Sequence, residues 1–359
     1  MNIIFLAPYA PFVSPSQRFR FEHYLQLLQK EGIQYNYSPF ADIKTSQLMF
    51  SNGSLFTKVK GVTTGFVKRF ILLFKLGKYD YVYIHREATP LGPPLFEWVI
   101  AKVLNKKIIY DFDDNIWIKM SSTANPTATL IKCRWKVKYI CKWSYITTAG
   151  NDYLLEFASK YCKKAILIPT VVDTSNLHNR TKNQHEEPLT IGWTGTFFNF
   201  IYFYKITQPI RRLQEKYKFR FVIIADRNPQ LTDVAYDFIK WNKASEIEDL
   251  LKLHIGLMPL DNTEIEFGKC AFKAIQYMSL GIPAIVSPVS ANCKVVDDGI
   301  NGYWADTEQE WYAKLETLLL NPDKRIEMGK LAQQKIENQY SVSATSKIFL
   351  DLFKSVNPQ

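Results

Sequence analysis

The stretch IIYDFDDNIW, residues 108–117, places three carboxylates within four positions directly after an apolar run. Such a group can hold a metal through oxygen ligands, act as a catalytic base, or cap the turn that follows. The apolar run indicates a buried strand, and in a parallel sheet the carboxyl ends of the strands face the ligand site. We therefore take Asp111 and Asp114 as candidate catalytic residues, and we expect Asp113 to face away or to cap.

A second group of charged residues follows the first apolar run, NIIFLA. Within SPSQRFR, Arg18 and Arg20 alternate with aromatic neighbours near the start of a helix that we expect to end at Gly32, with Ser16 as its N-cap. The two arginines could bind a phosphate of an acceptor substrate or form surface ion pairs.

The run IHRE ends another strand pattern, YDYVYIHRE. His85, Arg86 and Glu87 should therefore point to the same edge of the sheet as the carboxylates. A lone histidine is more often structural, but three such side chains together at a strand's end favour a site on the acceptor side.

The strongest local pattern in the second half is EIEFGKCAFKAIQYMSLGIPAIVSP, residues 264–288. Gly268 precedes a helix in which Lys269, Lys273 and Gln276 share one face. The free N–H groups and the dipole of such a helix start can bind a phosphate, with a lysine in the first turn. The alternative is an ordinary amphipathic helix whose lysines are solvated.

Strand and helix patterns alternate along the whole chain, which predicts parallel α/β sheets. The length of 359 residues favours two domains. The polar segment 171–188 is the best linker, and a second α/β series begins at LTIGWTG. We therefore expect an N-terminal domain over 1–170, a C-terminal domain over 189–340, and a docking helix over 341–359 with Ser341 or Ser343 as its cap.

The net charge of +11 is concentrated in the first half of the chain. Residues 1–180 hold 24 Lys and Arg against 12 Asp and Glu, and the remaining 21 and 22 fall after them. Such asymmetry suggests an anionic partner: lipid headgroups, a phosphorylated lipid or nucleic acid. No usual nucleic-acid motif is present, so we expect no nucleic-acid partner.

Two basic, aromatic stretches bear on the same question. KVKGVTTGFVKRFILLFK places Phe66, Val67, Phe70, Ile71 and Phe74 on one helical face, which could be core or could lie on an anionic membrane. IKCRWKVKYICKW carries five cations in the eleven residues 132–142. The first residues are expected to form a strand rather than a signal peptide, and the five cysteines form no metal-type CxxC pair. We expect a cytoplasmic protein.

The order of GKCAFKAIQYMSLGIPAIVSP, NG at 301–302, EW at 310–311, MGKLAQQ and YS at 340–341 resembles GT-B glycosyltransferases of the family 4 type. Upstream, APYAPFVSPSQRFR, IHRE, IIYDFDD, AGNDYL and IPTVVD resemble the bacterial surface-polysaccharide branch of that family. The resemblance covers nearly the whole chain. It implies two Rossmann-like domains facing across a cleft, with a nucleoside diphosphate sugar on the C-terminal one, and retaining transfer without a metal or other cofactor.

The resemblance also assigns residues. The family often has two glutamates eight apart, and here their positions hold Gly268 and Gln276, with Glu264 and Glu266 close to the first. Donor binding is thus expected from these residues: Gly195, Thr196, Glu266, Gly268, Lys269, Cys270, Ala271, Lys273 and Gln276. Lys269 and Lys273 would also stabilise the leaving diphosphate. In relatives a catalytic or sugar-contacting His or Asp lies near the strand end that carries Asp111 and Asp114.

The leading hypothesis is a glycosyltransferase at the inner face of the cell membrane that moves a sugar to a lipid-linked or glycan acceptor in cell-surface polysaccharide biosynthesis. The missing glutamates leave open an inactive sugar-nucleotide-binding protein. A nucleic-acid-binding module is the remaining alternative.

Overall fold

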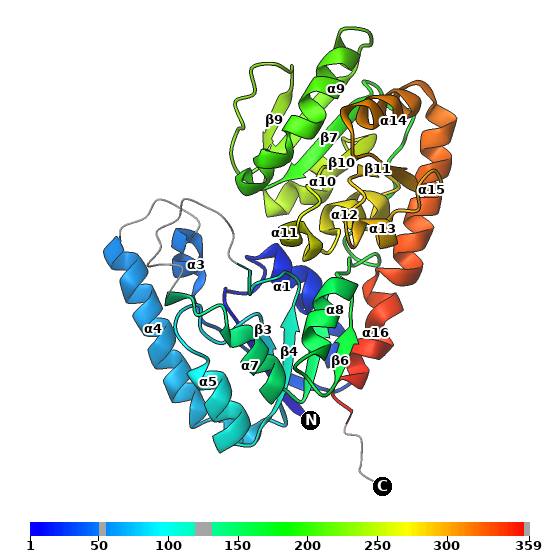
Figure 1. The fold of residues 1–359 in the computed structure, drawn as a ribbon. Coiled ribbons are helices and arrows are strands. Elements are labelled where there is room, and N and C mark those ends of the chain that lie inside the picture. Colours follow the sequence, from blue (N-terminus) through cyan, green and yellow to red (C-terminus); the bar gives the residue numbers. More distant parts are fainter. Residues whose placement is uncertain (50–54, 119–130, 355–359) are drawn as a thin grey trace. The chain divides into compact units, whose positions relative to one another are not determined.

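The computed structural model describes residues 1–49, 55–118 and 131–354, and its contacts divide the chain into two compact units (Figure 1). Unit 1 comprises residues 1–170 and 346–359, and unit 2 comprises residues 171–345. Each unit contains a parallel six-stranded sheet with helices packed on it. Among the described residues, no helix is long and apolar enough to span a membrane.

In unit 1 the strands are arranged in the order β2-β1-β3-β4-β5-β6. The strands are β1 (Asn2–Ala7), β2 (Gln34–Pro39), β3 (Tyr81–His85), β4 (Lys107–Phe112), β5 (Ile146–Ala149) and β6 (Ala165–Leu167). The helices are α1 (Pro15–Arg20), η1 (Glu22–Tyr24), α2 (Leu25–Lys30), α3 (Ile43–Met49), α4 (Leu55–Leu73), η2 (Leu76–Lys78), α5 (Leu95–Trp98), η3 (Val99–Val103), α7 (Lys136–Trp143) and α8 (Asp152–Ser159). The order reverses between β1 and β3, and in such sheets the crevice at this point is the usual ligand site.

The helix expected after the first strand begins earlier than predicted and is interrupted. Ser14, with φ −100° and ψ 128°, occupies the cap position, and Pro15 opens α1 because its fixed φ suits the first turn. Ser16 lies inside the helix and its hydroxyl is bonded elsewhere, so its prediction as the N-cap was wrong. The segment continues through η1 and α2 and ends, as predicted, at Gly32, where φ is +68°.

In unit 2 the strands are arranged in the order β12-β11-β10-β7-β8-β9. The strands are β7 (Thr190–Gly195), β8 (Arg220–Ala225), β9 (Asp237–Lys240), β10 (Ile255–Met258), β11 (Ala284–Val286) and β12 (Gly302–Trp304). The helices are η4 (Phe197–Tyr202), α9 (Tyr204–Gln214), η5 (Lys243–Ser245), α10 (Glu246–Leu250), α11 (Glu264–Phe267), α12 (Phe272–Ser279), α13 (Asn292–Val295), α14 (Glu308–Leu320) and α15 (Pro322–Gln339). Here the order reverses between β7 and β10, which again marks a crevice.

Residues 171–188, for which the sequence suggested a linker, pack within unit 2. The Nε2 of Gln184 donates to the backbone oxygens of His254 (3.2 Å) and Gly281 (3.3 Å). Lys182 and His178 are buried as well. The segment is polar because its side chains form hydrogen bonds with backbone groups of unit 2. Composition alone does not reveal this role.

The last helix, α16 (Val342–Asp351), begins in unit 2 and continues into unit 1. Its first turn is capped by Ser341, whose Oγ accepts the N–H of Ala344 at 3.0 Å, as predicted. In unit 1 the ring of Phe349 stacks on that of Tyr24, with centroids 4.0 Å apart and planes at 4°. Phe353 meets Tyr81 edge to face.

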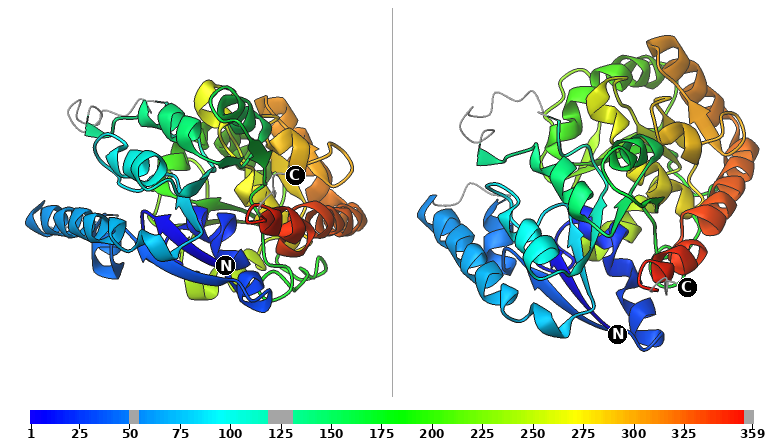
Figure 2. Two further views of the ribbon diagram at one scale, coloured as in Figure 1. Left: turned by 90° about the horizontal axis from the view of Figure 1, so that it is seen from below. Right: turned by 60° about the horizontal axis from the view of Figure 1, so that its bottom comes forward.

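Helix α4 buries an arginine, whereas Phe70 in the helix and Phe74 just after its end are exposed. Arg69 is 2% exposed and donates to the backbone oxygens of Ala88 (2.8 Å), Ser38 (2.9 Å) and Ala7 (3.2 Å). Phe70 and Phe74 are 58% and 78% exposed. Both views of Figure 2 show α4 at the periphery of unit 1. Of the face that the sequence left open as core or membrane surface, Val67, Phe70, Ile71 and Phe74 are thus exposed, whereas Phe66 packs against the rings of Phe40 and Phe96.

We expect Phe349→Ala to lower the free energy of unfolding by about 3–5 kcal/mol, because it removes a buried ring that fills space against Tyr24. Ile348→Ala is the matched control: this neighbour is 36% exposed and should change stability by less than about 1 kcal/mol. Urea unfolding measures both variants, and amide exchange should place the loss in β1 and β3. Equal effects of the two substitutions would contradict the packing of α16 on unit 1.

Candidate functional site

Three polar side chains lie in a row across neighbouring strands of unit 1. His85 ends β3, Asp111 lies beside it in β4, and Thr148 lies beside Asp111 in β5. The carboxylate of Asp111 accepts a hydrogen bond from the Nδ1 of His85 (2.7 Å) and one from the hydroxyl of Thr148 (2.7 Å). All three are fully buried. Parallel register therefore places these groups together at the carboxyl ends of the strands.

The arginine that follows β1 completes this row. The Nη2 of Arg20 lies 2.5 Å from Oδ1 of Asp111, and its Nη1 donates to the backbone oxygen of Ile168. Burial alone would raise the pKa of Asp111, but Arg20 and His85 outweigh it and hold that pKa well below its usual value. Both Asp111 oxygens are engaged inside the unit, so any part that Asp111 takes in a reaction would act through His85. Arg20 is likewise engaged inside the unit, because it forms the ion pair with Asp111.

A second ion pair lies next to the first. Arg86 and Asp113 are 2.8 Å apart, with 30% and 13% of their side chains exposed. Asp113 was expected to face away or to cap, and that prediction was wrong. Arg86 adopts φ +60°, a left-handed backbone that is uncommon outside glycine, at the end of β3. Arg86 thus reaches the surface, whereas the neighbouring Glu87 pairs with Lys136 at 2.7 Å.

The remaining candidates of unit 1 are Asp114 and Arg18, of which Arg18 is buried. Asp114 is partly exposed, and its Oδ1 accepts the N–H of Asn115 at 3.0 Å, which is a local turn contact. The guanidinium of Arg18 lies over the ring of Phe19, 4.8 Å from its centroid. Among the described residues, no group of three or more His, Cys, Asp or Glu is placed to hold a metal.

In unit 2 two of the predicted donor residues, Gly195 and Lys273, lie together at the end of β7. Gly195 ends β7, and a Cβ added there would lie 2.8 Å from Cε of Lys273, so this lysine passes directly over the glycine. The ammonium of Lys273 lies 5.6 Å from the ring centroid of Trp193. Desolvation, and the nearby charge of Lys269, lower the pKa of Lys273 to about 7. An ammonium held in this way gains much from an anionic ligand.

The chain before α12 turns through an unusual backbone. Ala271 occupies the cap position with φ +53°, a left-handed conformation that costs an alanine about 1 kcal/mol. The sulfur of Cys270 lies 3.7 Å from the backbone oxygen of Gly268. The first N–H groups of α12 have no acceptor within the helix itself, as at every helix start. Thr196 is exposed at the start of η4.

Glu266, which lies close to the first of the family's two glutamate positions, and Gln276, which occupies the second, are both buried. Glu266 is 3% exposed, and its carboxylate accepts hydrogen bonds from the hydroxyls of Tyr202 and Thr263, each at 2.5 Å. Gln276 is 2% exposed, and its Nε2 is enclosed without a hydrogen-bond partner. An enclosed amide without a partner costs about 1–3 kcal/mol, so Gln276 has a free donor for a ligand that reaches it.

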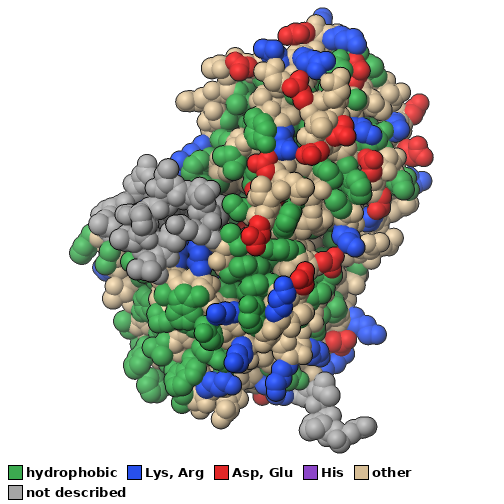
Figure 3. Space-filling model, viewed as in Figure 1, with side chains coloured by type: hydrophobic (Ala, Val, Ile, Leu, Met, Phe, Trp, Pro, Cys, Tyr) green, Lys and Arg blue, Asp and Glu red, His purple; other side chains and the backbone are tan. Residues whose placement is uncertain are grey.

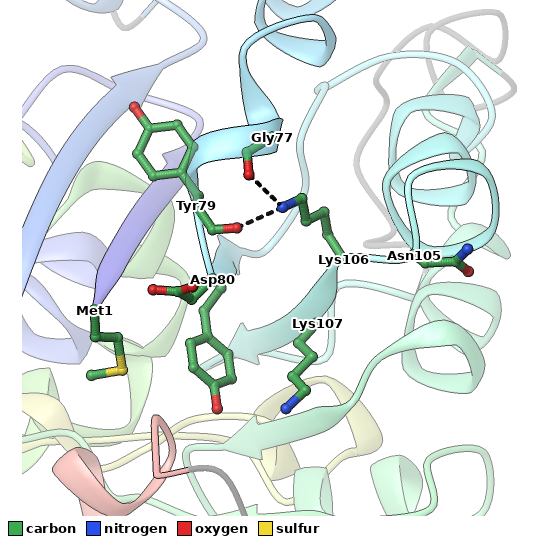
Figure 4. Close-up of a pocket in the computed structure, with 8 residues that line it drawn as sticks. Met1, Gly77, Tyr79, Asp80, Asn105, Lys106 and Lys107 are labelled. Carbon is green, nitrogen blue, oxygen red and sulfur yellow. Dashed lines mark hydrogen bonds between the residues drawn. The ribbon is translucent and has the colours of Figure 1, made fainter.

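A pocket of about 510 Å³ opens at the other end of the unit 1 sheet, at the amino ends of β1, β3 and β4 (Figure 4). Its Lys106 donates to the backbone oxygens of Gly77 (3.0 Å) and Tyr79 (2.8 Å). The ammonium of Lys107 lies over the rings of Tyr81 and Tyr145. These lysines stabilise the edge of the sheet, and the pocket contains none of the predicted site residues.

Comparisons with known proteins bear on the fold of the chain and on the family of one segment. Residues 188–321 match the family model described as Glycosyl transferases group 1. The chain is similar in structure to sucrose-phosphate synthase from Thermosynechococcus elongatus, with TM-score 0.66, 12% identity, and 98% and 99% of the two chains covered. It is similar to a glycosyltransferase from Rickettsia africae, with TM-score 0.68, 12% identity, and coverage of 98% and 97%. HepE of Anabaena in complex with UDP and glucose aligns with TM-score 0.62, 12% identity, and coverage of 98% and 99%. No curated protein matches the sequence.

The chain therefore has the GT-B fold, as predicted from the sequence. The segment that matches the Glycosyl transferases group 1 model lies within unit 2, and this match supports a glycosyltransferase. The surface-polysaccharide branch stays a prediction, as do the roles of the individual site residues.

Sequence reasoning missed several residues that build the two crevices. Ser16 was read as a cap, and Thr148 and Tyr202 were not considered. Aligning the ends of the predicted strands would have placed Thr148 beside Asp111, because parallel neighbours share a register. The contact of Tyr202 with Glu266 spans 64 residues and leaves no local signal.

We expect Asp111→Asn to lower the free energy of unfolding by about 3–5 kcal/mol, because it leaves the buried charge of Arg20 without its partner. Asp114→Asn is the matched control and should be nearly neutral. Because the pKa of Asp111 is depressed in the folded protein, its contribution is present above its usual pKa and disappears as the pH falls below that value. Urea unfolding between pH 3 and pH 7 measures both effects. Equal stability of the two variants at pH 7 would refute this assignment.

Proposed function

We propose that the protein transfers a sugar from a nucleoside diphosphate sugar to a lipid-linked or glycan acceptor in cell-surface polysaccharide biosynthesis. The observation that carries the proposal is the placement of Lys273 at the crevice of unit 2, where it lies over Gly195 with a depressed pKa and Lys269 nearby. Two lysines and the start of a helix suit a diphosphate. The complex of HepE with UDP favours a uridine donor.

The mechanism that fits these groups is electrostatic. Negative charge develops on the diphosphate as its bond to the sugar breaks, and Lys273, Lys269 and the first amides of α12 would stabilise it. Binding of that diphosphate would restore the proton of Lys273. We propose that transfer proceeds without a metal and with retention of the anomeric configuration, as the resemblance to family 4 implies. Gln276 would donate its free Nε2 hydrogen to a ribose oxygen.

We propose further that unit 1 lies on the anionic inner face of the cell membrane. The exposed aromatic and aliphatic residues of α4 are continued on neighbouring helices, since α4 packs against α5 and α5 against α7. Figure 3 shows hydrophobic side chains gathered over this part of unit 1, with Lys and Arg beside them. The exposed residues, which we call the α4 face, are Val67, Phe70, Ile71, Phe74, Leu95, Trp98, Val103, Trp135 and Tyr139. Such a face with flanking cations fits an anionic lipid surface.

A second candidate is a sugar-nucleotide-binding protein without transferase activity, which is favoured by Gly268 and Gln276 at the positions of the family's glutamates. Binding of labelled UDP- or GDP-sugars with neither transfer nor hydrolysis, in the presence of membrane lipids, would establish it.

For the donor site, we expect Lys273→Met to weaken binding of UDP by about 10- to 100-fold, since a charge-assisted hydrogen bond contributes about 1.5–3 kcal/mol. In the wild type, affinity should fall as the pH rises above 7, because binding must then take up a proton at Lys273. Calorimetry between pH 6.5 and 8.5, in buffers of different ionisation enthalpy, measures affinity and proton uptake together.

Two controls sharpen this experiment. Lys330→Met removes an exposed lysine of α15 and should leave UDP affinity unchanged. Lys269→Met removes the charge that helps to depress the pKa of Lys273, so the pH dependence should move to higher pH. If proton uptake is the same in wild type and Lys273→Met, the assignment of Lys273 is wrong. GDP tested in parallel reports on the base.

For the membrane surface, we expect the double substitution Phe70→Ser and Phe74→Ser to reduce binding to vesicles containing phosphatidylglycerol by at least about tenfold, because each buried ring contributes about 1.5–3 kcal/mol. Phe198→Ser is the control, as it removes a 63% exposed ring from unit 2. Vesicle flotation at low and high salt measures both contributions, and salt should weaken the binding of all variants. Undiminished flotation of the double variant would exclude the α4 face.

A further inference from the structure

The crevice of unit 1 contains a hydrogen-bonded chain that ends at a serine. The Oγ of Ser16 lies 2.8 Å from Nε2 of His85, and the Nδ1 of His85 lies 2.7 Å from Oδ2 of Asp111. Ser16 is partly exposed, whereas His85 and Asp111 are fully buried behind it. The chain joins the segment after β1 to the end of β3, which is where the strand order of the sheet reverses.

The surroundings fix the roles of the two imidazole nitrogens. Asp111 stays ionised because Arg20 compensates its charge. The carboxylate therefore accepts a hydrogen bond from Nδ1 of His85, and Nδ1 carries the proton. Nε2 of a neutral His85 can then accept the hydroxyl hydrogen of Ser16, for which the carboxylate of Asp113 competes, and the lone pairs of Oγ remain for an incoming donor. This is the arrangement in which an imidazole draws a proton from a serine hydroxyl.

A protonated His85 produces a different pattern of hydrogen bonds. Its Nε2 then donates to Ser16, and Ser16 donates to Asp113, whose pKa its hydrogen bond helps to lower. Oγ then has no capacity to pass a further proton to His85. The charged and titratable groups facing His85 are these: Asp111, Asp113, Arg20 and Glu22. The ring of Phe21 packs against the imidazole from the remaining side.

We propose that Ser16 is a catalytic residue of the acceptor side, which receives the reacting hydroxyl of the acceptor and passes its proton to His85. The inference rests on the proposed glycosyl transfer. The acceptor's proton moves to Oγ of Ser16 while the proton of Ser16 moves to Nε2 of His85. The acceptor oxygen bonds to the anomeric carbon, the bond from that carbon to the diphosphate breaks, and its electron pair leaves with the diphosphate. His85 returns its proton through Ser16 to solvent.

In this step His85 and Asp111 act through Ser16 as positioning residues. Asp111 stabilises the imidazolium that forms, and Arg20 prevents the carboxylate from taking the proton itself. The relay relieves the leaving diphosphate of the proton that it would otherwise have to accept. No step of this proton transfer needs an added oxidant, reductant or metal.

The test compares Ser16→Ala with Ser14→Ala, which deletes a hydroxyl two residues earlier that makes no capping bond. Transfer is measured from UDP-glucose and GDP-mannose to a panel of octyl glycosides. We expect Ser16→Ala to lower kcat by about 100-fold, the scale of general-base catalysis, with UDP affinity unchanged. Ser14→Ala should retain activity, and Ser16→Thr, which restores a hydroxyl, should recover most of it.

The pH profile separates a relay from a merely structural serine. In the wild type, kcat should rise with pH on one limb of the profile, and this limb should be absent in Ser16→Ala. Equal kcat values and pH profiles for the two alanine variants would overturn the relay. Failure of the wild type to bind either UDP or GDP would instead contradict the proposed function.

Nitrogen-15 NMR of the imidazoles tests the relay without turnover. The relay requires a neutral His85 that carries its proton on Nδ1, with an Nε2 signal that shifts in Ser16→Ala and not in Ser14→Ala. A proton on Nε2 of the neutral ring would overturn the proposal, whatever the activity.

Discussion

The enclosed carboxylate of Asp111 is the constraint on which unit 1 depends. A buried charge is tolerated only when its partners match it, and here Arg20, His85 and Thr148 do so from three different elements. The ion pair ties the segment after β1 to β4, and through the backbone oxygen of Ile168 it reaches the chain after β6. Because Arg20 must lie inside, the helix that carries it turns the neighbouring Ser16 toward His85. The polar crevice is thus a consequence of neutralising one charge.

The two units handle charge in opposite ways. In unit 1, Asp111 and Asp113 each have an arginine partner, and their pKa values are lowered against the effect of burial. In unit 2, Lys273 lies over Gly195 and Trp193 with another lysine nearby, and its pKa is depressed. A buried carboxylate that is paired with an arginine is held rigidly and can support a series of hydrogen bonds. A buried ammonium without a carboxylate partner gains most when an anionic ligand binds to it. This contrast matches a division of work between proton handling and diphosphate binding.

The sequence sufficed for the fold, which follows from strand and helix patterns and a family resemblance. It did not suffice for the chemistry of unit 1. Asp113 was expected to face away, yet it pairs with Arg86, whose left-handed backbone has no signal in IHRE. Ser16 fits the residue preferences of a cap, but Pro15 moved the helix start and freed its hydroxyl for His85. Long-range contacts decided these cases, and local patterns do not encode them.

Helix α4 shows the limit of periodicity most clearly. The spacing of Phe70 and Phe74 is equally suited to a core and to a lipid surface, because both are apolar. The orientation of α4 is decided by Arg69, which lies about a quarter-turn around the helix from Phe70. The hydrogen-bond acceptors of Arg69 lie at the strand ends of unit 1. An unpaired arginine in a bilayer interior is far more costly than exposed rings in water, so the arginine determines the orientation and the rings face outward. The aromatic face is then maintained at some cost in water, which an apolar surface outside the protein would remove.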